Sequence, residues 1–282
     1  VIGRNLRLLS SEQHDAAFYA AMWRALRAEG QWQGEIWSRR YSGEEFAAWL
    51  TVSALRDERG QIEQFVGLFS DITAQKTHKM QLEYIAHYDA LTGLPNRVLL
   101  HDRLGQGMAQ ARRRGGHLAV AYIDLDGFKE VNDGYGHDMG DRLLVELALR
   151  MKAGLREGDS MSRLGGDEFV AVLGDLDGES RAVQLVQRLL ATLALPVRCG
   201  AEKLQVSASI GLTLYPQLED VDADQLLRQA DLAMYQAKLT GKNRYHLFDI
   251  AQDRKLRGRH RSLTRIGRAL GAQDLCSITS RR

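Results

Sequence analysis

Two short acidic clusters stand out among the residues whose types and spacing can support chemistry. Asp124 and Asp126 end an apolar run two positions apart, so both side chains lie on one face of a strand. Further along the chain, Asp167 and Glu168 follow a Gly-Gly pair between two predicted strands. A Gly-Gly pair is typical of a hairpin turn, and its missing side chains let a ligand approach the backbone closely.

These positions suit Mg²⁺, which takes one or two carboxylates and completes its shell with phosphate oxygens and water. Two such ions can clamp the attacking and leaving oxygens of a phosphoryl transfer. Either cluster taken alone could equally be an acidic turn that only keeps a hairpin soluble, rather than a metal site. Together, with a strand leading into each, the two clusters favour a metal site.

Several common nucleotide and metal motifs are absent from the sequence. The Gly241-Lys242 pair is followed by Asn243, which excludes a Walker A loop. A calcium loop that begins at Asp124 fails because Phe128 occupies a ligand position. No His-Glu-x-x-His occurs, and no Gly-rich dinucleotide fingerprint follows a strand.

The composition is that of an ordinary globular protein. Lys and Arg number 38 against 36 Asp and Glu, so no global field recruits nucleic acid or an anionic membrane. No apolar run approaches the roughly 18 residues that span a bilayer. Two cysteines, Cys199 and Cys276, make neither a disulfide framework nor a four-ligand zinc site, so a cytoplasmic location is expected. Because the sequence begins with Val1, it is interpreted as a fragment, and membrane attachment of a longer parent stays open.

The hydrophobic pattern predicts two folded parts joined by a helix over 72–88. That segment contains no Gly or Pro, and Asp71 is placed to cap it. Thr73, Thr77, Met80 and Tyr84 form a stripe along it at helical spacing. Before it, the pattern predicts a helix and a small antiparallel sheet, over 14–29, 32–39, 46–55 and 61–70.

After the connecting helix, helices and strands alternate. Helices are predicted over 97–113, 140–156, 179–194 and 222–239. Strands are predicted over 117–124, 160–164, 169–174, 204–215 and 244–248. This pattern predicts an α/β (α+β) domain next to a smaller α+β domain.

Residues 165–169, Gly-Gly-Asp-Glu-Phe, carry the signature of the GGDEF family of diguanylate cyclases, which the chain resembles. Four further motifs resemble that family in the same order, over 89–97, 124–129, 132–141 and 237–243. The resemblance covers 87–249 and implies a cyclase domain over 88–249, with a central mixed sheet flanked by helices. Five ordered motifs are far more specific than one.

The resemblance implies a metal site and a reaction. Asp124, Asp167 and the Leu125 carbonyl would bind Mg²⁺, or Mn²⁺ in its place, with Glu168 beside them. Glu168 would help the metals or the proton of the 3′-hydroxyl, so Asp167, Glu168 and Lys129 are the implied catalytic residues. The implied reaction condenses two GTP into cyclic di-GMP with loss of two pyrophosphates. Each protomer holds one GTP, so catalysis needs a homodimer.

The resemblance also implies the GTP contacts. Asn132 and Asp141 would read guanine, because a carboxylate accepts from guanine N1–H and N2–H₂ whereas adenine presents an acceptor at N1. Such a mismatch can reject the wrong base by roughly 10⁴-fold. Lys129, Lys238 and Lys242 would neutralise the triphosphate. The remaining implied substrate contacts are Phe128, Gly165 and Gly166.

Arg156 and Asp159 match the family's Arg-x-x-Asp product-inhibition site in letters and in spacing from the signature. The resemblance therefore implies an allosteric site for cyclic di-GMP, with Arg188 as a further contact. A helix-terminal Arg followed by a capping Asp is the alternative. For the whole domain, the alternative function is a catalytically quiet module that binds GTP or cyclic di-GMP.

The flanking segments resemble two other families. Residues 1–73 resemble the second half of a PAS sensor domain, with its first strands missing, and 74–87 form the connecting helix. Residues 250–282 form a basic tail with a helical pattern over 252–270, which resembles the lead-in to an EAL phosphodiesterase domain. No Glu-Ala-Leu occurs, so no phosphodiesterase activity is expected.

Overall fold

The computed structural model describes residues 11, 13–199 and 202–249. The chain divides into two compact units, 1–86 and 87–282. Each unit is described by itself. The basic tail predicted over 250–282 lies outside the described residues. Within the described residues, no helix combines the length and the apolar character needed to cross a membrane.

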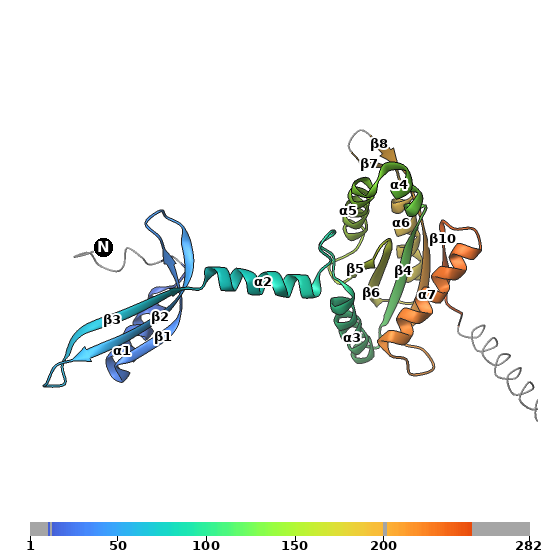
Figure 1. The fold of residues 1–282 in the computed structure, drawn as a ribbon. Helices are drawn as coiled ribbons and strands as arrows, with labels where there is room; N and C mark the ends of the chain where they lie inside the picture. The colour runs from blue at the N-terminus through green and yellow to red at the C-terminus, as the bar shows by residue number, and fades with distance from the viewer. Residues whose placement is uncertain (1–10, 12, 200–201, 250–282) are drawn as a thin grey trace, which may run out of the picture. The chain divides into compact units, whose positions relative to one another are not determined.

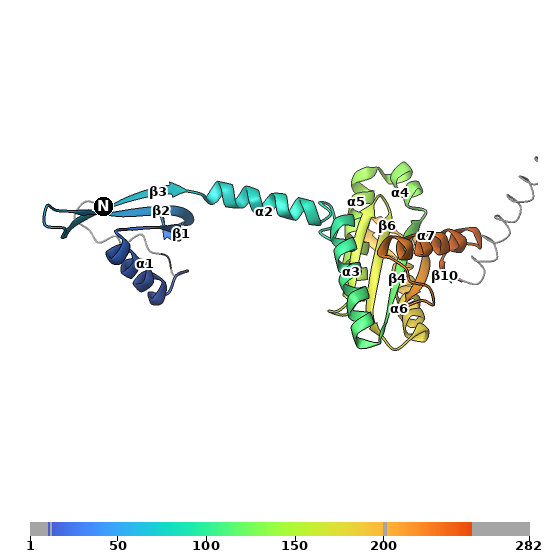
Figure 2. The ribbon, with the colours of Figure 1, turned by 90° about the horizontal axis from the view of Figure 1, so that it is seen from below.

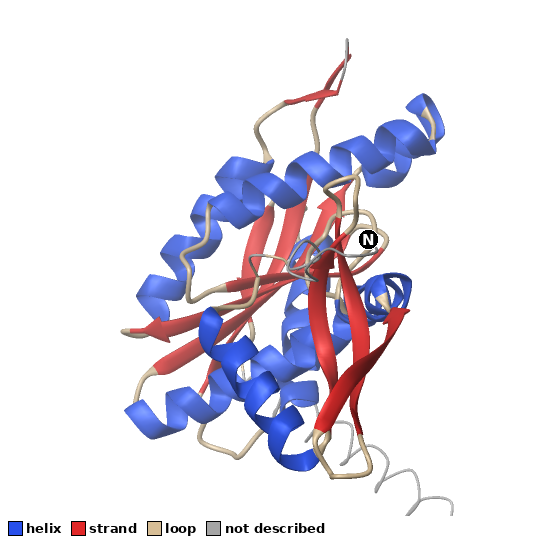
Figure 3. Cartoon of the chain, turned by 90° about the vertical axis from the view of Figure 1, so that its left-hand side faces the viewer, coloured by secondary structure: helices blue, strands red, loops and turns tan. Residues whose placement is uncertain are grey.

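The first unit packs one helix against a three-stranded antiparallel sheet (Figures 1 and 3). Its elements are α1 (Ala16–Glu29), β1 (Gln31–Arg39), β2 (Glu45–Arg56) and β3 (Ile62–Asp71), with strand order β1-β2-β3. Asp15 caps α1 by accepting a hydrogen bond from the Phe18 amide at 2.8 Å, and Gly30 ends the helix in the left-handed region. Met22 and Leu26 of α1 lie in the small core beneath the sheet.

The connecting helix α2 (Thr73–His87) follows β3 directly. Asp71 accepts a hydrogen bond from the Thr73 amide at 2.9 Å, which confirms the predicted cap. Together with the Thr73 hydroxyl and Arg40, that bond lowers the pKa of Asp71 to about 2. None of the α2 residues, all of which the structure describes, is buried. Met80 and Tyr84 of the predicted stripe are among its exposed large side chains.

A five-stranded sheet forms the centre of the second unit (Figure 2). Its strands are β4 (His117–Asp126), β5 (Ser160–Gly165), β6 (Glu168–Leu176), β9 (Ser207–Tyr215) and β10 (Arg244–Leu247), in the order β10-β9-β4-β6-β5. β10 runs parallel to β9, and the other neighbours pair antiparallel. The predicted central mixed sheet is therefore confirmed.

Helices cover both faces of this sheet. On one face, α3 (Arg97–Arg114) and α7 (Ala223–Leu239) pack over Val120 and Tyr122 of β4. The larger core lies on the other face, where α4, α5 and α6 pack over Ile123 of β4. These helices are α4 (Phe128–Tyr135), α5 (His137–Ala153) and α6 (Glu179–Leu193). A short hairpin of β7 (Val197–Cys199) and β8 (Glu202–Leu204) completes the unit.

Candidate active site

The sheet brings the two acidic clusters together. Asp124 lies near the end of β4 and is buried, and it pairs with Glu168 of β6 on one side and Ser209 of β9 on the other. Directly paired residues lie about 5 Å apart and face the same side of a sheet. The Asp124 and Glu168 side chains therefore share the face that α7 covers.

A lysine of α7 neutralises Asp124. The Lys238 ammonium Nζ lies 2.7 Å from Asp124 Oδ2, and the Asp124 side chain is 9% exposed. Burial raises the pKa of Asp124 above its ordinary value, and the charges of Asp167 and Asp126 add to the rise, whereas Lys238 opposes it. The site therefore presents a buried carboxylate that a cation stabilises.

Asp126 has a different role from Asp124, although the two share a strand face. Its carboxylate accepts hydrogen bonds from the hydroxyls of Ser207 and Ser209 at 2.8 Å each, and from the Asn243 amide at 3.1 Å. Both oxygens are thus occupied by β9 and by the loop before β10. Asp126 therefore holds that loop beside the site. Of the two aspartates in this cluster, only Asp124 remains a candidate metal ligand.

The signature turn joins β5 to β6. Gly165 and Gly166 have φ of +143° and +53°, conformations that favour glycine. The Asp167 carbonyl accepts a hydrogen bond from the Leu125 amide at 3.3 Å, so the turn lies against the end of β4. The sharp turn thereby places Asp167 and Glu168 beside Asp124.

Arg163 holds this turn from within β5. Its Nε and Nη2 donate to the Gly166 carbonyl oxygen at 3.1 and 2.8 Å. Its Nη1 lies 2.9 Å from Asp89 Oδ1, which also accepts from the amide and hydroxyl of Thr92. Burial would raise the pKa of Asp89, but the hydrogen bonds from Thr92 and Arg163 outweigh it and lower the pKa. The first family motif is thereby tied to the signature turn.

The predicted guanine readers lie on α4 and α5. Asn132 Oδ1 is buried and has no hydrogen-bond partner among the described residues. It lies where a Cβ on Gly140 would be, at 1.9 Å, so glycine at that position makes room for the amide. Asp141 follows Gly140 and is exposed. Phe128, in contrast, is buried in the larger core, so its ring packs α4 against that core.

The predicted phosphate contacts are cationic and accessible. Lys129 on α4 and Lys242 in the loop before β10 are exposed. Lys242 and Asn243 adopt left-handed backbone conformations, with φ of +58° and +47°, and the Lys242 amide donates to the Ala237 carbonyl at 3.1 Å. This loop therefore forms a compact turn after α7. The Asn243 amide fixes the turn to Asp126.

The acidic side chains of the site could serve as ligands of a divalent metal. Within 13–199 and 202–249, no group of three or more His, Cys, Asp or Glu side chains is placed to hold a metal ion. Mg²⁺ needs fewer protein ligands than that when substrate phosphates complete its shell. The buried Asp124 carboxylate already holds a cation in the form of the Lys238 ammonium. Asp124, Asp167 and Glu168 therefore fit a metal that arrives with a polyphosphate.

Comparison with known proteins decides the family. Residues 86–244 match the family model described as "Diguanylate cyclase, GGDEF domain". The chain belongs to the GGDEF family. Residues 1–74 match a PAS domain model, which confirms the resemblance of the first unit.

Relatives and solved structures agree with this assignment. The GGDEF chain is 44% identical over 169 residues to the bifunctional diguanylate cyclase/cyclic di-GMP phosphodiesterase MucR of Pseudomonas aeruginosa, covering 60% of this chain and 24% of MucR. The isolated GGDEF domain of TpbB from the same organism superposes with a TM-score of 0.58 at 38% identity, over 61% of this chain and 99% of that one. The chain spans less than half the length of the curated relatives MucR and TpbB.

A second solved structure contains a ligand. The coiled coil and GGDEF domain of DgcB from Caulobacter crescentus, in complex with cyclic di-GMP, superposes with a TM-score of 0.55 at 25% identity. The match covers 62% of this chain and 93% of that one.

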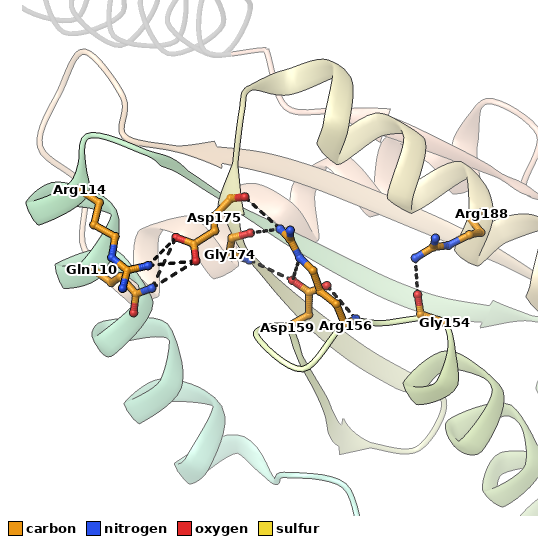
Figure 4. Close-up of polar contacts among 8 residues, drawn as sticks. All are labelled: Gln110, Arg114, Gly154, Arg156, Asp159, Gly174, Asp175 and Arg188. Carbon is orange, nitrogen blue, oxygen red and sulfur yellow. Dashed lines mark hydrogen bonds and ion pairs between the residues drawn. The ribbon is translucent and has the colours of Figure 1, made fainter.

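The predicted product-site residues of this GGDEF domain lie at the open end of the β5–β6 hairpin, away from the signature turn (Figure 4). Arg156 contacts Asp159 and the carbonyls of Gly174 and Asp175, and Arg188 donates to the Gly154 carbonyl. The Asp159 side chain is fully buried and accepts from the Arg156 and Gly174 amides at 3.3 and 3.2 Å. Asp159 therefore caps its own turn and is not exposed to a ligand.

Sequence reasoning missed several residues that build this GGDEF site. Arg163, Ser207 and Ser209 position the acidic groups, but their partners are far apart in sequence. Tyr122 also belongs here: burial raises its pKa, and the Glu168 carboxylate, which it faces across the strands, raises it further. The strand register alone could have found Tyr122, because it precedes Asp124 by two positions.

Proposed function

We propose that this GGDEF domain condenses two GTP molecules into cyclic di-GMP and two pyrophosphates. The observation that carries the proposal is the intact signature turn, which Arg163 holds through the Gly166 carbonyl and which lies against β4 beside Asp124. Around it lie a buried carboxylate, accessible lysines and an unpartnered buried amide oxygen. A polyphosphate, a divalent metal and a purine base need such groups.

Each group has a distinct task in this reaction. Asp124 and Asp167, with the Leu125 carbonyl, would hold Mg²⁺, or Mn²⁺ in its place. Such a metal, when bound, neutralises the phosphates and stabilises charge as the new phosphodiester bond forms. Lys238, Lys242 and Lys129 bind the triphosphate. Lys238 then exchanges its contact with Asp124 for one with phosphate.

Base recognition falls to Asn132 and Asp141. The Asn132 Oδ1 atom needs a donor, and guanine offers two, N1–H and N2–H₂. A buried acceptor left unpaired by the wrong base costs about 1–3 kcal/mol. Gly165 and Gly166 let the nucleotide approach the backbone of the turn. Adenine should therefore be rejected.

The proton of the attacking 3′-hydroxyl would pass toward Glu168. Glu168 shares a sheet face with Asp124, and its carboxylate faces the Tyr122 hydroxyl. Tyr122 is buried, so its neutral hydroxyl orients Glu168 without competing as a base.

Ring closure requires two protomers, because each holds one GTP and the hydroxyl of one nucleotide attacks the α-phosphate of the other. We infer that the exposed stripe of α2 joins the protomers. Product release is followed by feedback: cyclic di-GMP binds at Arg156, with Arg188 as a second cation. A helix N-terminal to the domain and a PAS unit before it are consistent with activity controlled by a signal.

The test is incubation of the protein with GTP and Mg²⁺, followed by chromatographic identification of the product. Cyclic di-GMP that forms from GTP, together with no cyclic dinucleotide from ATP, supports the proposal. A protein that binds GTP without turning it over would instead be the quiet binding module.

A further inference from the structure

Asp175, near the end of β6, has an unusual backbone. Its φ is +43°, in the left-handed region that non-glycine residues rarely adopt, although Asp and Asn tolerate it best. In an extended strand, successive carbonyls point in opposite directions, whereas in a helical conformation of either hand they point the same way. The left-handed turn at Asp175 therefore aligns the Gly174 and Asp175 carbonyls.

Both carbonyls accept hydrogen bonds from one nitrogen of Arg156. Nη2 of Arg156 donates to the Asp175 oxygen at 3.0 Å and also to the Gly174 oxygen (Figure 4). The Arg156 side chain is 44% exposed, so its remaining edge faces solvent. The guanidinium that is proposed to bind product is thus already engaged by the strand.

The Asp175 side chain is held from another direction. Arg114 Nη1, in the last turn of α3, lies 3.3 and 3.5 Å from the two carboxylate oxygens, and Gln110 Nε2 lies 3.5 Å from each (Figure 4). These are exposed contacts and individually weak. They nevertheless keep the carboxylate on the α3 side, which favours the backbone conformation that Arg156 needs.

We propose that Asp175 is a latch that holds Arg156 on β6 and so sets the affinity of the product site. Cyclic di-GMP has to draw Arg156 away from the two carbonyls before the guanidinium can pair with phosphate or guanine. Product binding and latch closure then oppose each other, and the opposition is reciprocal in free energy. The inference rests on the product site proposed above and adds its regulation by α3.

Substitutions at Asp175 separate the backbone from the side chain. Asp175→Ala removes the carboxylate and disfavours the left-handed conformation, so it opens the latch. Asp175→Asn keeps an amide oxygen for Arg114 and Gln110 and tolerates the left-handed region. It is the matched control. Arg114→Ala removes a contact of the Asp175 carboxylate and so weakens the latch, without changing residue 175 itself. The Asp175 side chain is 56% exposed, so the fold does not depend on it.

The experiment measures cyclic di-GMP binding to the 282-residue chain and to each variant of it by calorimetry, after bound nucleotide has been removed. Asp175→Ala should bind roughly fivefold more tightly than the parent, because opening the latch is no longer required. Arg114→Ala should shift in the same direction by less, and Asp175→Asn should match the parent. In ligand-free Asp175→Ala, hydrogen exchange at the Asp159 and Gly174 amides should also rise.

Three kinds of outcome contradict the inference, and they are distinguishable. Equal affinities in the parent, Asp175→Ala and Arg114→Ala, with normal binding by the parent, would overturn the latch alone. A parent that does not bind cyclic di-GMP, or an Arg156→Ala variant that binds it as the parent does, would remove the product site and the latch with it. Weaker binding by Asp175→Ala would show that the turn is part of the ligand site.

Discussion

Arg163 clamps the Gly166 carbonyl oxygen with two guanidinium nitrogens, at 2.8 and 3.1 Å, from a side chain that is 9% exposed. The third nitrogen is paired with Asp89, two residues after α2 ends. A rigid fork thus connects the first residues of the domain to the turn that carries Asp167 and Glu168. We therefore expect the position of these two proposed catalytic carboxylates to depend on this clamp.

Arg163→Lys tests the clamp. A lysine can reach one acceptor but cannot hold the Gly166 carbonyl and Asp89 together in a fixed geometry. Turnover should fall by roughly 100-fold through misplacement of the turn, with the KM for GTP changed much less. Steady-state kinetics provide the measurement, and thermal unfolding checks the fold. An unchanged kcat would show that the turn is held by its own backbone.

Asp89→Asn should destabilise the domain in a pH-dependent way. The folded state lowers the pKa of Asp89 below its ordinary value of 3.8, so the carboxylate stabilises the fold above that pH and stops doing so as the pH falls through the lowered pKa. The loss should be about 1–3 kcal/mol at pH 7 and should shrink below pH 3.8.

Hydrogen exchange in β5 and β6 measures this difference, because Trp23, Trp32, Trp37 and Trp49 all lie in the first unit and their fluorescence does not report on the second. A destabilisation that stays constant between pH 7 and pH 3 would mean that the Arg163 pair contributes nothing through charge.

Gly140→Ala tests how Asn132 is placed. The new Cβ would lie 1.9 Å from Asn132 Oδ1, so the amide must turn away. Discrimination between GTP and ATP should weaken by roughly tenfold or more, since a buried acceptor no longer meets guanine. Gly134→Ala on α4 is the control, because nothing lies within 4 Å of its added Cβ. Equal discrimination in both variants would mean that guanine is read elsewhere.

Met80→Glu tests the role of α2 in assembly. Met80 is 64% exposed on a helix without buried residues, so the substitution leaves the monomer intact but places charge on the exposed stripe. Specific activity of the parent should rise with protein concentration, and the variant should need roughly tenfold more protein to reach half of its maximum. Gln81→Glu adds the same charge beside the stripe and serves as the control. If the specific activities of the parent and of Met80→Glu were both independent of protein concentration, assembly through α2 would be excluded.

Much of this fold could be predicted from the hydrophobic pattern. Buried strands such as β4 are nearly continuous apolar runs, and the glycine pair marks the β5–β6 turn. α4 was not predicted, because it has eight residues and contains Gly134, so it shows too little periodicity. The β7–β8 hairpin was missed for the same reason, since each strand has three residues.

The site was predictable only where family motifs carried it. Asp124 and Glu168 were identified correctly as neighbours because the family resemblance places them at one metal site. Arg163 and Asp126 could not be assigned, because a hydrogen bond between residues 74 or 117 positions apart has no local signal. Asp159 was expected to face a ligand, whereas its side chain is buried in its own turn.

The most direct test compares the parent with Asp167→Asn and counts both products. Asp167 is half-buried next to the exposed Gly165-Gly166 pair and is not part of either hydrophobic core of the domain, so the variant should fold normally, and Asp177→Asn is a control carboxylate outside the site. With GTP and Mg²⁺, the parent and Asp177→Asn should release two pyrophosphates for each cyclic di-GMP, and Asp167→Asn should release neither. Undiminished cyclic di-GMP from Asp167→Asn, or pyrophosphate from the parent without the cyclic dinucleotide, would contradict the account.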